Sequence, residues 1–284
     1  MKKIVCLGGG NAMPNVILKE LKNREVDLSV ISAVLDSGGS SGKLREDYNI
    51  IAVGDMRRAL LELSTLKDKE IFSYRFEDGF LKGHNLGNLI MAAILIKEED
   101  KVLALNNFFQ TKFKVLPITF DNVDLCAELE SGEIIKGETN IDIPKHNSKI
   151  KKVFLSREAN IYKEAYEKII EANVITIGPG DLYSSLIQIL LVSGVSKAFK
   201  ETKAKIFYVC NKTNKKGETD NFRVSDFEKE IEKYLGRELD YVIFNNKKTI
   251  DLIDFDDYND SKHIGLDLIN DGPKNIINKL IEII

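Results

Sequence analysis

Cysteine, histidine and tryptophan are scarce in this sequence of 284 residues. It has three cysteines, three histidines and no tryptophan. Cys6, Cys126 and Cys210 lie far apart, without the close spacing of a metal site, and their odd number argues against a framework of disulfides. We expect buried, reduced thiols in a cytoplasmic protein.

The chain also lacks a large net charge and a long apolar run. Its formal net charge is -3 and its isoelectric point is about 5.8, so no basic field recruits nucleic acid or anionic membranes. No apolar run approaches the roughly 20 residues that span a bilayer. The run in MKKIVCL is too short for a signal peptide. We therefore predict a cytoplasmic protein with no membrane span and no nucleic-acid partner.

What the sequence does contain is an alternation of strands and helices. The β-branched apolar runs at 3–7 and 28–35 predict buried strands, and a segment of helical periodicity separates them. The segment 83–97 predicts a helix that is apolar on nearly all sides, and we therefore expect it to be buried. The pattern predicts an α/β fold with a Rossmann-like, doubly wound, mainly parallel sheet, in a single domain over 1–284 with a β-hairpin insertion near 111–150.

Three glycine-rich turns follow three of the predicted strands. They are Gly8-Gly9-Gly10, the segment 37–42 and Gly178-Pro179-Gly180. In an open parallel sheet, turns at the carboxyl ends of strands line one crevice where ligands bind. Glycine lets the backbone approach a ligand, and free N–H groups at a following helix N-terminus attract phosphate. We therefore predict one site for a large anionic ligand, such as a nucleotide or a phosphorylated small molecule.

The first turn partly matches the dinucleotide fingerprint G-x-G-x-x-G. Met13 occupies the third glycine position, and Asp36 could be the acidic residue that follows the second strand. Either the turn binds a ligand through Gly9, Gly10 and the N–H groups near Asn11, or it is a tight connection without a ligand.

The second turn mixes glycines and hydroxyls with two cations. Such a mixture suits an oxyanion, over which Lys43 and Arg45 would close. For Asp36 two roles are equally supported: a carboxylate ligand for a divalent cation such as Mg²⁺, or a cap for the turn itself. The candidate ligand-binding residues of this turn are Asp36, Ser37, Gly38, Gly39, Ser40, Ser41, Lys43 and Arg45.

Further candidates stand at the starts of three helices. Asp55 and Arg57 are predicted to face the crevice, whereas Arg58 is assigned to the surface.

The third turn resembles a phosphate cradle without the ending of a P-loop, which argues against ATP hydrolysis of the Walker type. His84 and its neighbours either bind the ligand or are hydrogen-bonded structural residues, and with no second histidine or cysteine nearby we predict no transition-metal site. The candidates in these two regions are His84, Asn85, Asn88, Gly178, Pro179, Gly180, Asp181, Tyr183 and Ser184.

Several motifs occur together in a fixed order. They are GGGN (8–11), DSGGSSGKLRE (36–46), VGDMRRALLELS (53–64), GHNLGNLI (83–90), GE (137–138), IGPGDLYSSL (177–186), VCN (209–211) and GET (217–219). Together they resemble the CofD/YvcK-like family, also called UPF0052, and within it the branch of bacterial gluconeogenesis factors. The resemblance implies a Rossmann-like fold that binds a nucleotide or a UDP-linked sugar between these turns. It also implies a homodimer and a role in central carbon metabolism and cell shape, and it assigns no catalysed reaction to this branch.

The sequence departs from the family pattern at identifiable positions. Asn11-Ala12 stands where the family often has Thr-Gly. Ser37 replaces a second aspartate, which weakens the case for a metal-dependent transferase. The stretch KTNKK (212–216) replaces an apolar stretch of the Met-Thr-Gln type.

Three functions are compatible with the sequence. The first is a nucleotide-sugar-binding regulator without turnover. The second is a Mg²⁺-dependent transferase of the 2-phospho-L-lactate kind that acts on a nucleotide-activated donor, with Asp36 and Asp55 as catalytic residues. The third is a dinucleotide-dependent enzyme, which Met13 at the third glycine position argues against.

Overall fold

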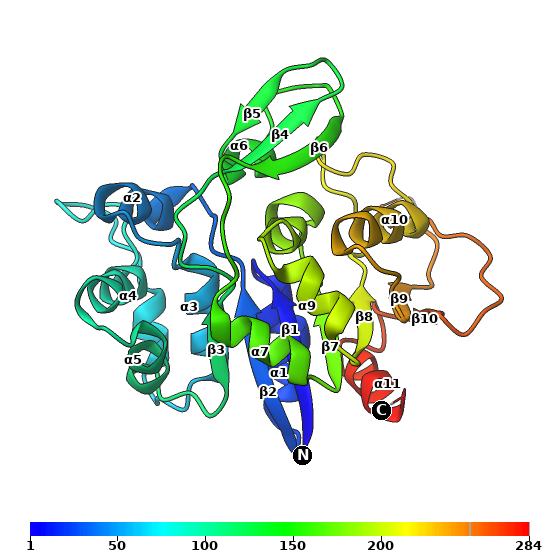
Figure 1. Cartoon of the computed structure of the whole chain (residues 1–284), viewed down its shortest axis with the longest axis horizontal. Coiled ribbons are helices and arrows are strands. Elements are labelled where there is room, and N and C mark those ends of the chain that lie inside the picture. The colour runs from blue at the N-terminus through cyan, green and yellow to red at the C-terminus, as the bar shows by residue number, and fades with distance from the viewer. Residues whose placement is uncertain (250, 284) are drawn as a thin grey trace.

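In the computed structural model, which describes residues 1–249 and 251–283, seven parallel strands form one sheet. The strand order is β10-β9-β8-β7-β1-β2-β3, with β1 at the centre (Figure 1). The chain moves from β1 to β2 on one side and later places β7 on the other, so the order reverses beside β1, where ligands bind in such sheets. The strands are β1 (Lys2–Gly8), β2 (Val26–Ser32), β3 (Lys114–Pro117), β7 (Val174–Ile177), β8 (Lys205–Val209), β9 (Tyr241–Asn245) and β10 (His263–Leu266).

Helices cover both faces of this sheet, as right-handed crossovers between parallel strands require. On one face α9 contacts both α7 and α10, and on the other η1 contacts α1 and α3, while α1 contacts α11 (Figure 1). The predicted α/β fold is therefore confirmed. The helices are η1 (Pro14–Leu18), α1 (Lys19–Leu21), α2 (Gly39–Tyr48), α3 (Gly54–Leu63), η2 (Lys69–Ser73), α4 (Leu86–Lys97), α5 (Lys101–Phe108), α6 (Glu138–Asp142), α7 (Lys163–Glu171), η3 (Leu182–Ile187), α8 (Gln188–Leu190), α9 (Val195–Glu201), α10 (Val224–Leu235) and α11 (Lys274–Ile283).

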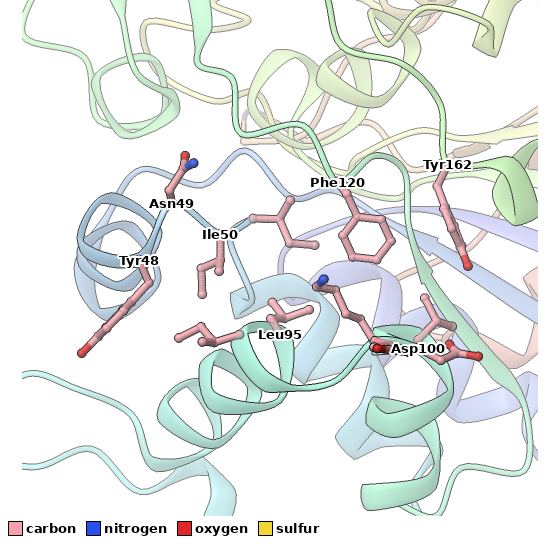
Figure 2. Close-up of a pocket in the computed structure, with 12 residues that line it drawn as sticks. Tyr48, Asn49, Ile50, Leu95, Asp100, Phe120 and Tyr162 are labelled. Carbon is pink, nitrogen blue, oxygen red and sulfur yellow. The ribbon is translucent and has the colours of Figure 1, made fainter.

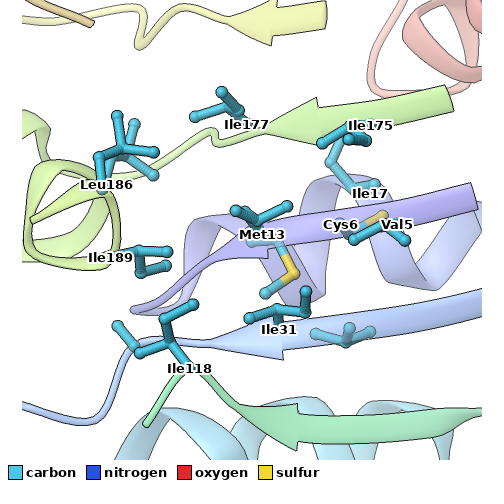
Figure 3. Close-up of a cluster of buried hydrophobic side chains, with 14 of the residues drawn as sticks. Val5, Cys6, Met13, Ile17, Ile31, Ile118, Ile175, Ile177, Leu186 and Ile189 are labelled. Atoms are coloured by element: carbon cyan, nitrogen blue, oxygen red, sulfur yellow. The ribbon is translucent and has the colours of Figure 1, made fainter. Parts of the chain in front are cut away.

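The hydrophobic core lies between the central strands and the helices that follow them. Figure 3 shows Val5, Ile31 and Ile175 from β1, β2 and β7 beside Met13 and Ile17. Met13, which replaces a fingerprint glycine, is 1% exposed, and its side chain packs 3.3 Å from the position that a Cβ on Gly8 would take. The third fingerprint position therefore belongs to the core and does not face a ligand.

The middle of the chain forms a second, smaller sheet of three antiparallel strands. β4 (Leu125–Leu129) lies between β5 (Ile134–Lys136) and β6 (Ile150–Leu155). Figure 1 shows this sheet and α6 projecting beyond the carboxyl ends of the central strands. The insertion is therefore a hairpin with a third strand, and β3, which precedes it, belongs to the main sheet.

The expectation that the apolar helix over 83–97 is buried is wrong for its outer side. In α4, Met91 and Leu95 are buried, but Ile96 is 54% exposed and Ala93 also faces solvent. The reason is that α4 is an outer helix, whose inner side packs against α2, α3 and α5. Within the described residues, no helix is both long and apolar enough to cross a membrane.

The predicted buried thiols are confirmed. Cys6, Cys126 and Cys210 are free and buried. Burial raises the pKa of the Cys6 thiol to about 12, because a thiolate in an apolar strand would lose its hydration. This thiol is therefore protonated and unreactive at neutral pH.

Candidate functional site

The three glycine-rich turns meet at one cavity of about 560 Å³. It opens at the carboxyl ends of β1, β2 and β7, and α6 of the small sheet forms its opposite wall. The predicted residues that line it are Gly9, Gly10, Asn11, Asp36, Gly38, Gly39, Asp55, Gly180 and Asp181. Ser185, in the helical turn that follows the third glycine turn, also lines it. The lining residues that the sequence did not mark as candidates are Ala12, Arg58, Glu138, Thr139, Asp142, Ile143, Asn211 and Lys215.

A larger hollow, of about 910 Å³, lies elsewhere, between the ends of α2 and α4 and the start of α5. Figure 2 shows Ile50, Leu95, Phe120 and Tyr162 around it. No glycine turn reaches this hollow, and one of its carboxylates, Asp100, caps α5 by accepting the Leu103 N–H at 3.0 Å. The cavity at the strand ends is the better candidate site because polar groups from distant segments converge there.

Several turn amides that the sequence assigned to an anionic ligand are hydrogen-bonded within the protein. Gly38 donates its N–H to Asp36 Oδ1 at 2.8 Å, and Gly180 donates to Asn211 Oδ1 at 3.1 Å. Glu218 Oε1 accepts the N–H groups of Tyr183 and Ser184 at 2.6 and 2.9 Å. These amides are therefore already satisfied by side-chain oxygens of the protein itself.

The serines of the second turn connect the elements around the cavity. Ser41 Oγ accepts the N–H groups of Val53 and Gly54 at the start of α3, at 3.0 and 3.1 Å. Ser37 Oγ accepts the Thr139 N–H of α6 at 3.0 Å. Ser40 Oγ accepts the Asn85 N–H at 3.1 Å and lies 3.3 Å from His84 Nδ1. None of these three serines lines the cavity, but Ser41 and Ser37 fix α3 and α6, which do, whereas Ser40 holds the start of α4.

The basic side chains near the first two turns do not lie where the sequence predicted. Lys43 is exposed on α2, and Arg45, 5% exposed, points to the base of the small sheet. Arg57 is buried against the Phe72 carbonyl at 3.2 Å, and burial lowers its pKa to about 10. Arg58, assigned to the surface, lines the cavity instead and forms an ion pair with Asp55.

The remaining candidates do not line the cavity. Asn85 caps α4, because its side chain accepts the Asn88 N–H at 3.2 Å. Asn88 is 3% exposed, and no partner for its Oδ1 occurs among the described residues. Tyr183 donates its hydroxyl to Glu230 at 3.2 Å. The turn residue Gly178 has φ +81°, which suits glycine, and Pro179 faces a neighbouring cavity of about 170 Å³.

Carboxylates dominate the electrostatics of the cavity. Burial, and then the negative charges of Asp36, Asp142 and Asp55, raise the pKa of Glu138 to about 9. Burial likewise raises the pKa values of Asp36 and Asp55. Carboxylates crowded in this way hold protons, or they hold a hard divalent cation, which prefers oxygen ligands.

Close approach of the first turn to this acidic group requires glycine. A Cβ on Gly9 would lie 2.3 Å from Asp55 Oδ2 and 3.0 Å from the Ala33 Cβ. Any larger residue at this position would displace the Asp55 carboxylate from the cavity wall. The glycine therefore serves the placement of a side chain as well as the shape of the turn.

Residues from two segments were missed because their proximity arises only in the folded chain. Glu138, Thr139 and Asp142 come from α6, and Asn211 and Lys215 follow β8. Two of the family motifs could have pointed to these segments, since GE (137–138) contains Glu138 and VCN (209–211) ends on Asn211. The rule that carboxyl ends of parallel strands share an edge would also have selected Asn211.

A doubly wound parallel sheet with a polar crevice at its carboxyl edge defines the class as a Rossmann-like α/β protein. The family model described as 2-phospho-L-lactate transferase CofD matches residues 4–281, and the chain belongs to this family.

Similar proteins identify the branch. The putative gluconeogenesis factor of Thermotoga maritima is 41% identical over 252 residues, covering 87% of this chain and 79% of that protein. The gluconeogenesis factor of Bacillus subtilis is 35% identical, covering 95% of this chain and 90% of that protein. The crystal structure of a UPF0052 family member from Bacillus halodurans matches with a TM-score of 0.85 and 33% identity, covering 90% of this chain and 88% of that chain. The family resemblance is therefore confirmed.

Proposed function

We propose that this protein is a cytoplasmic regulator of the gluconeogenesis-factor kind that binds a nucleotide or nucleotide sugar, UDP-linked sugars above all, in the cavity at the strand ends. The observation that supports this most is the convergence of three glycine-rich turns, distant in sequence, on that one cavity. Its ligand would signal the state of central carbon metabolism and influence cell shape. The homodimer that the resemblance implies stays a prediction.

The surroundings of the cavity also suit a nucleotide. An apolar cavity of about 170 Å³ adjoins it and shares Ala12 and Asn211 with it. Val16, Pro179 and Leu268 line this second cavity. An apolar space with an amide at its mouth suits a base or another flat ring, while the polar cavity suits phosphates and sugar hydroxyls.

A thermal-shift series tests this function. UDP-sugars, GDP and NAD are each added with and without Mg²⁺, and a true ligand raises the melting temperature by mass action. At a concentration 100-fold above the dissociation constant, the stabilisation is about 2.7 kcal/mol. We expect a shift with UDP-sugars and none with NAD. A shift with NAD alone, or none with any of these compounds, would reject the proposal.

A second candidate, the Mg²⁺-dependent transferase, is supported by the carboxylates of the cavity. Asp36, Asp55 and Glu138 offer oxygen ligands that fit a hard cation, and burial together with the neighbouring carboxylates raises the pKa of Glu138. A bound Mg²⁺ would supply charge neutralisation for a departing phosphate. In that case Asp55→Asn abolishes Mg²⁺-dependent loss of a nucleotide donor in the presence of an acceptor, whereas a pure regulator shows no donor loss in either protein.

A further inference from the structure

The segment 211–219, which follows β8, forms one rim of the cavity. Asn211 near its start accepts the Gly180 N–H at 3.1 Å, and Glu218 near its end accepts the N–H groups of Tyr183 and Ser184. Glu218 is only 4% exposed. Both ends of the segment are therefore fixed to the third glycine turn and the helix that follows it.

Lys215 lies between these two anchors and reaches across the cavity. Its Nζ donates to Asp142 Oδ1 of α6 at 2.7 Å and to Asp181 Oδ2 of the third turn at 3.0 Å. The side chain is 32% exposed and lines the cavity. Burial lowers the pKa of Lys215, but the hydrogen bonds and charges of the two aspartates outweigh this and raise it. The ammonium is therefore charged at neutral pH, and one of its hydrogens is left for another acceptor.

In the described part of the chain, few positive charges line the cavity, and the Lys215 ammonium is one of them. Among the described lining residues, the cations are Arg58 and Lys215. Arg58 pairs with Asp55 on the α3 side, so Lys215 is the cation of the opposite wall. The carboxylates of Asp142, Asp181 and Glu218 come within 4.8 Å of one another. The Lys215 ammonium bridges two of these carboxylates and so places a positive charge within the acidic group.

We propose that Lys215 binds a phosphate of the anionic ligand and is the residue by which this chain discriminates phosphorylated ligands from uncharged ones. The inference rests on the proposed function, since it requires a nucleotide in this cavity. Lysine is suited to the task because its flexible stem lets a compact charge shift between the aspartates and an entering phosphate. Lys215 belongs to KTNKK (212–216), the stretch in which this chain departs from the apolar family pattern.

Isothermal titration of UDP and uridine into the wild type and three variants tests this role. Lys215→Met keeps the length of the stem and removes the charge, and Lys215→Arg keeps the charge. Lys216→Met is the matched control, because Lys216 is exposed and does not line the cavity. For Lys215→Met we expect UDP affinity in Mg²⁺ to fall about 10-fold or more, the usual size of a lost charge-assisted hydrogen bond. Uridine affinity should stay within about 3-fold of the wild type, since uridine has no phosphate.

The outcomes separate this inference from the function on which it rests. If the wild type binds neither UDP nor a UDP-sugar, both are overturned. If the wild type binds UDP and Lys215→Met binds it equally well, only the role of Lys215 is overturned. An equal loss of UDP and uridine in Lys215→Met, not restored by Lys215→Arg, means a structural role and also rejects the proposal.

Discussion

Near the cavity, the carboxyl group of Glu218 is buried inside the protein. Its side chain is 4% exposed and accepts two main-chain N–H groups. Burial, aided by the charge of Asp181, raises its pKa to about 7, although the amides and Lys215 act in the opposite direction. The folded state therefore holds a proton on this group at a pH at which the unfolded chain has lost it.

This difference predicts a pH-dependent effect of Glu218→Gln. The raised pKa of the wild-type carboxyl lowers the free energy of unfolding as the pH rises from about 4.5 to about 7, at about 1.4 kcal/mol per pH unit at most. Glutamine can accept the same N–H groups and does not titrate. The stability of Glu218→Gln relative to the wild type should therefore increase between pH 5 and pH 7 and level off above it.

Urea denaturation at each pH provides the measurement. The exposed Glu77→Gln serves as the control and should show no such trend. A stability difference between Glu218→Gln and the wild type that stays constant from pH 5 to pH 8 would mean that Glu218 is ionised throughout this range in the folded protein.

At the scale of the element, helix α2 places two neighbouring basic side chains in different environments. Lys43 and Arg45 stand two residues apart, yet the first is exposed and the second is buried. Arg45 donates to Asn122 Oδ1 at 2.6 Å and forms an ion pair with Asp124 at 2.9 Å, just before β4 begins. We interpret Arg45 as the anchor that fixes the small sheet to α2.

Removal of this anchor should destabilise the protein. Arg45→Met leaves the acceptors of the 122–124 segment without their donor, and we expect a loss of about 2 kcal/mol in the free energy of unfolding. Lys43→Met, on the same helix, should stay within about 0.5 kcal/mol of the wild type. Chemical denaturation of both variants measures this. Equal effects of the two substitutions would contradict the anchoring role.

At the scale of the whole molecule, the sequence predicted the sheet better than the site. Apolar runs followed by glycine marked β1, β2 and β7, and their parallel order then required a shared carboxyl edge. Arg57 and Arg58 show where such reasoning stops. Successive helical residues point about 100° apart, so a small rotation of α3 decides which arginine is buried and which lines the cavity. That rotation depends on the packing of η1 and α4 against α3, which one segment's pattern does not reveal.

Hydrogen bonds connect the small sheet to the elements around the main sheet, and they support the proposal that 1–284 is a single domain. Besides the Arg45 anchor, Ser37 Oγ holds the Thr139 N–H at 3.0 Å, and the Tyr234 hydroxyl of α10 accepts the Val153 N–H of β6 at 3.0 Å. These hydrogen bonds would all have to break if the small sheet opened while the main sheet stayed folded. We therefore expect the small sheet to unfold together with the main one.

The absence of tryptophan makes this cooperativity directly measurable. Phe154→Trp introduces one fluorophore into β6 of the small sheet, and Tyr241→Trp introduces one into β9 of the main sheet. In a guanidinium titration, each fluorescence midpoint should coincide with the far-ultraviolet circular dichroism midpoint of the same variant, as cooperative unfolding requires. Comparison within each variant removes any effect of the substitution on stability. A fluorescence midpoint of Phe154→Trp below its dichroism midpoint would mean that the small sheet opens first, and the chain would then contain two folding units.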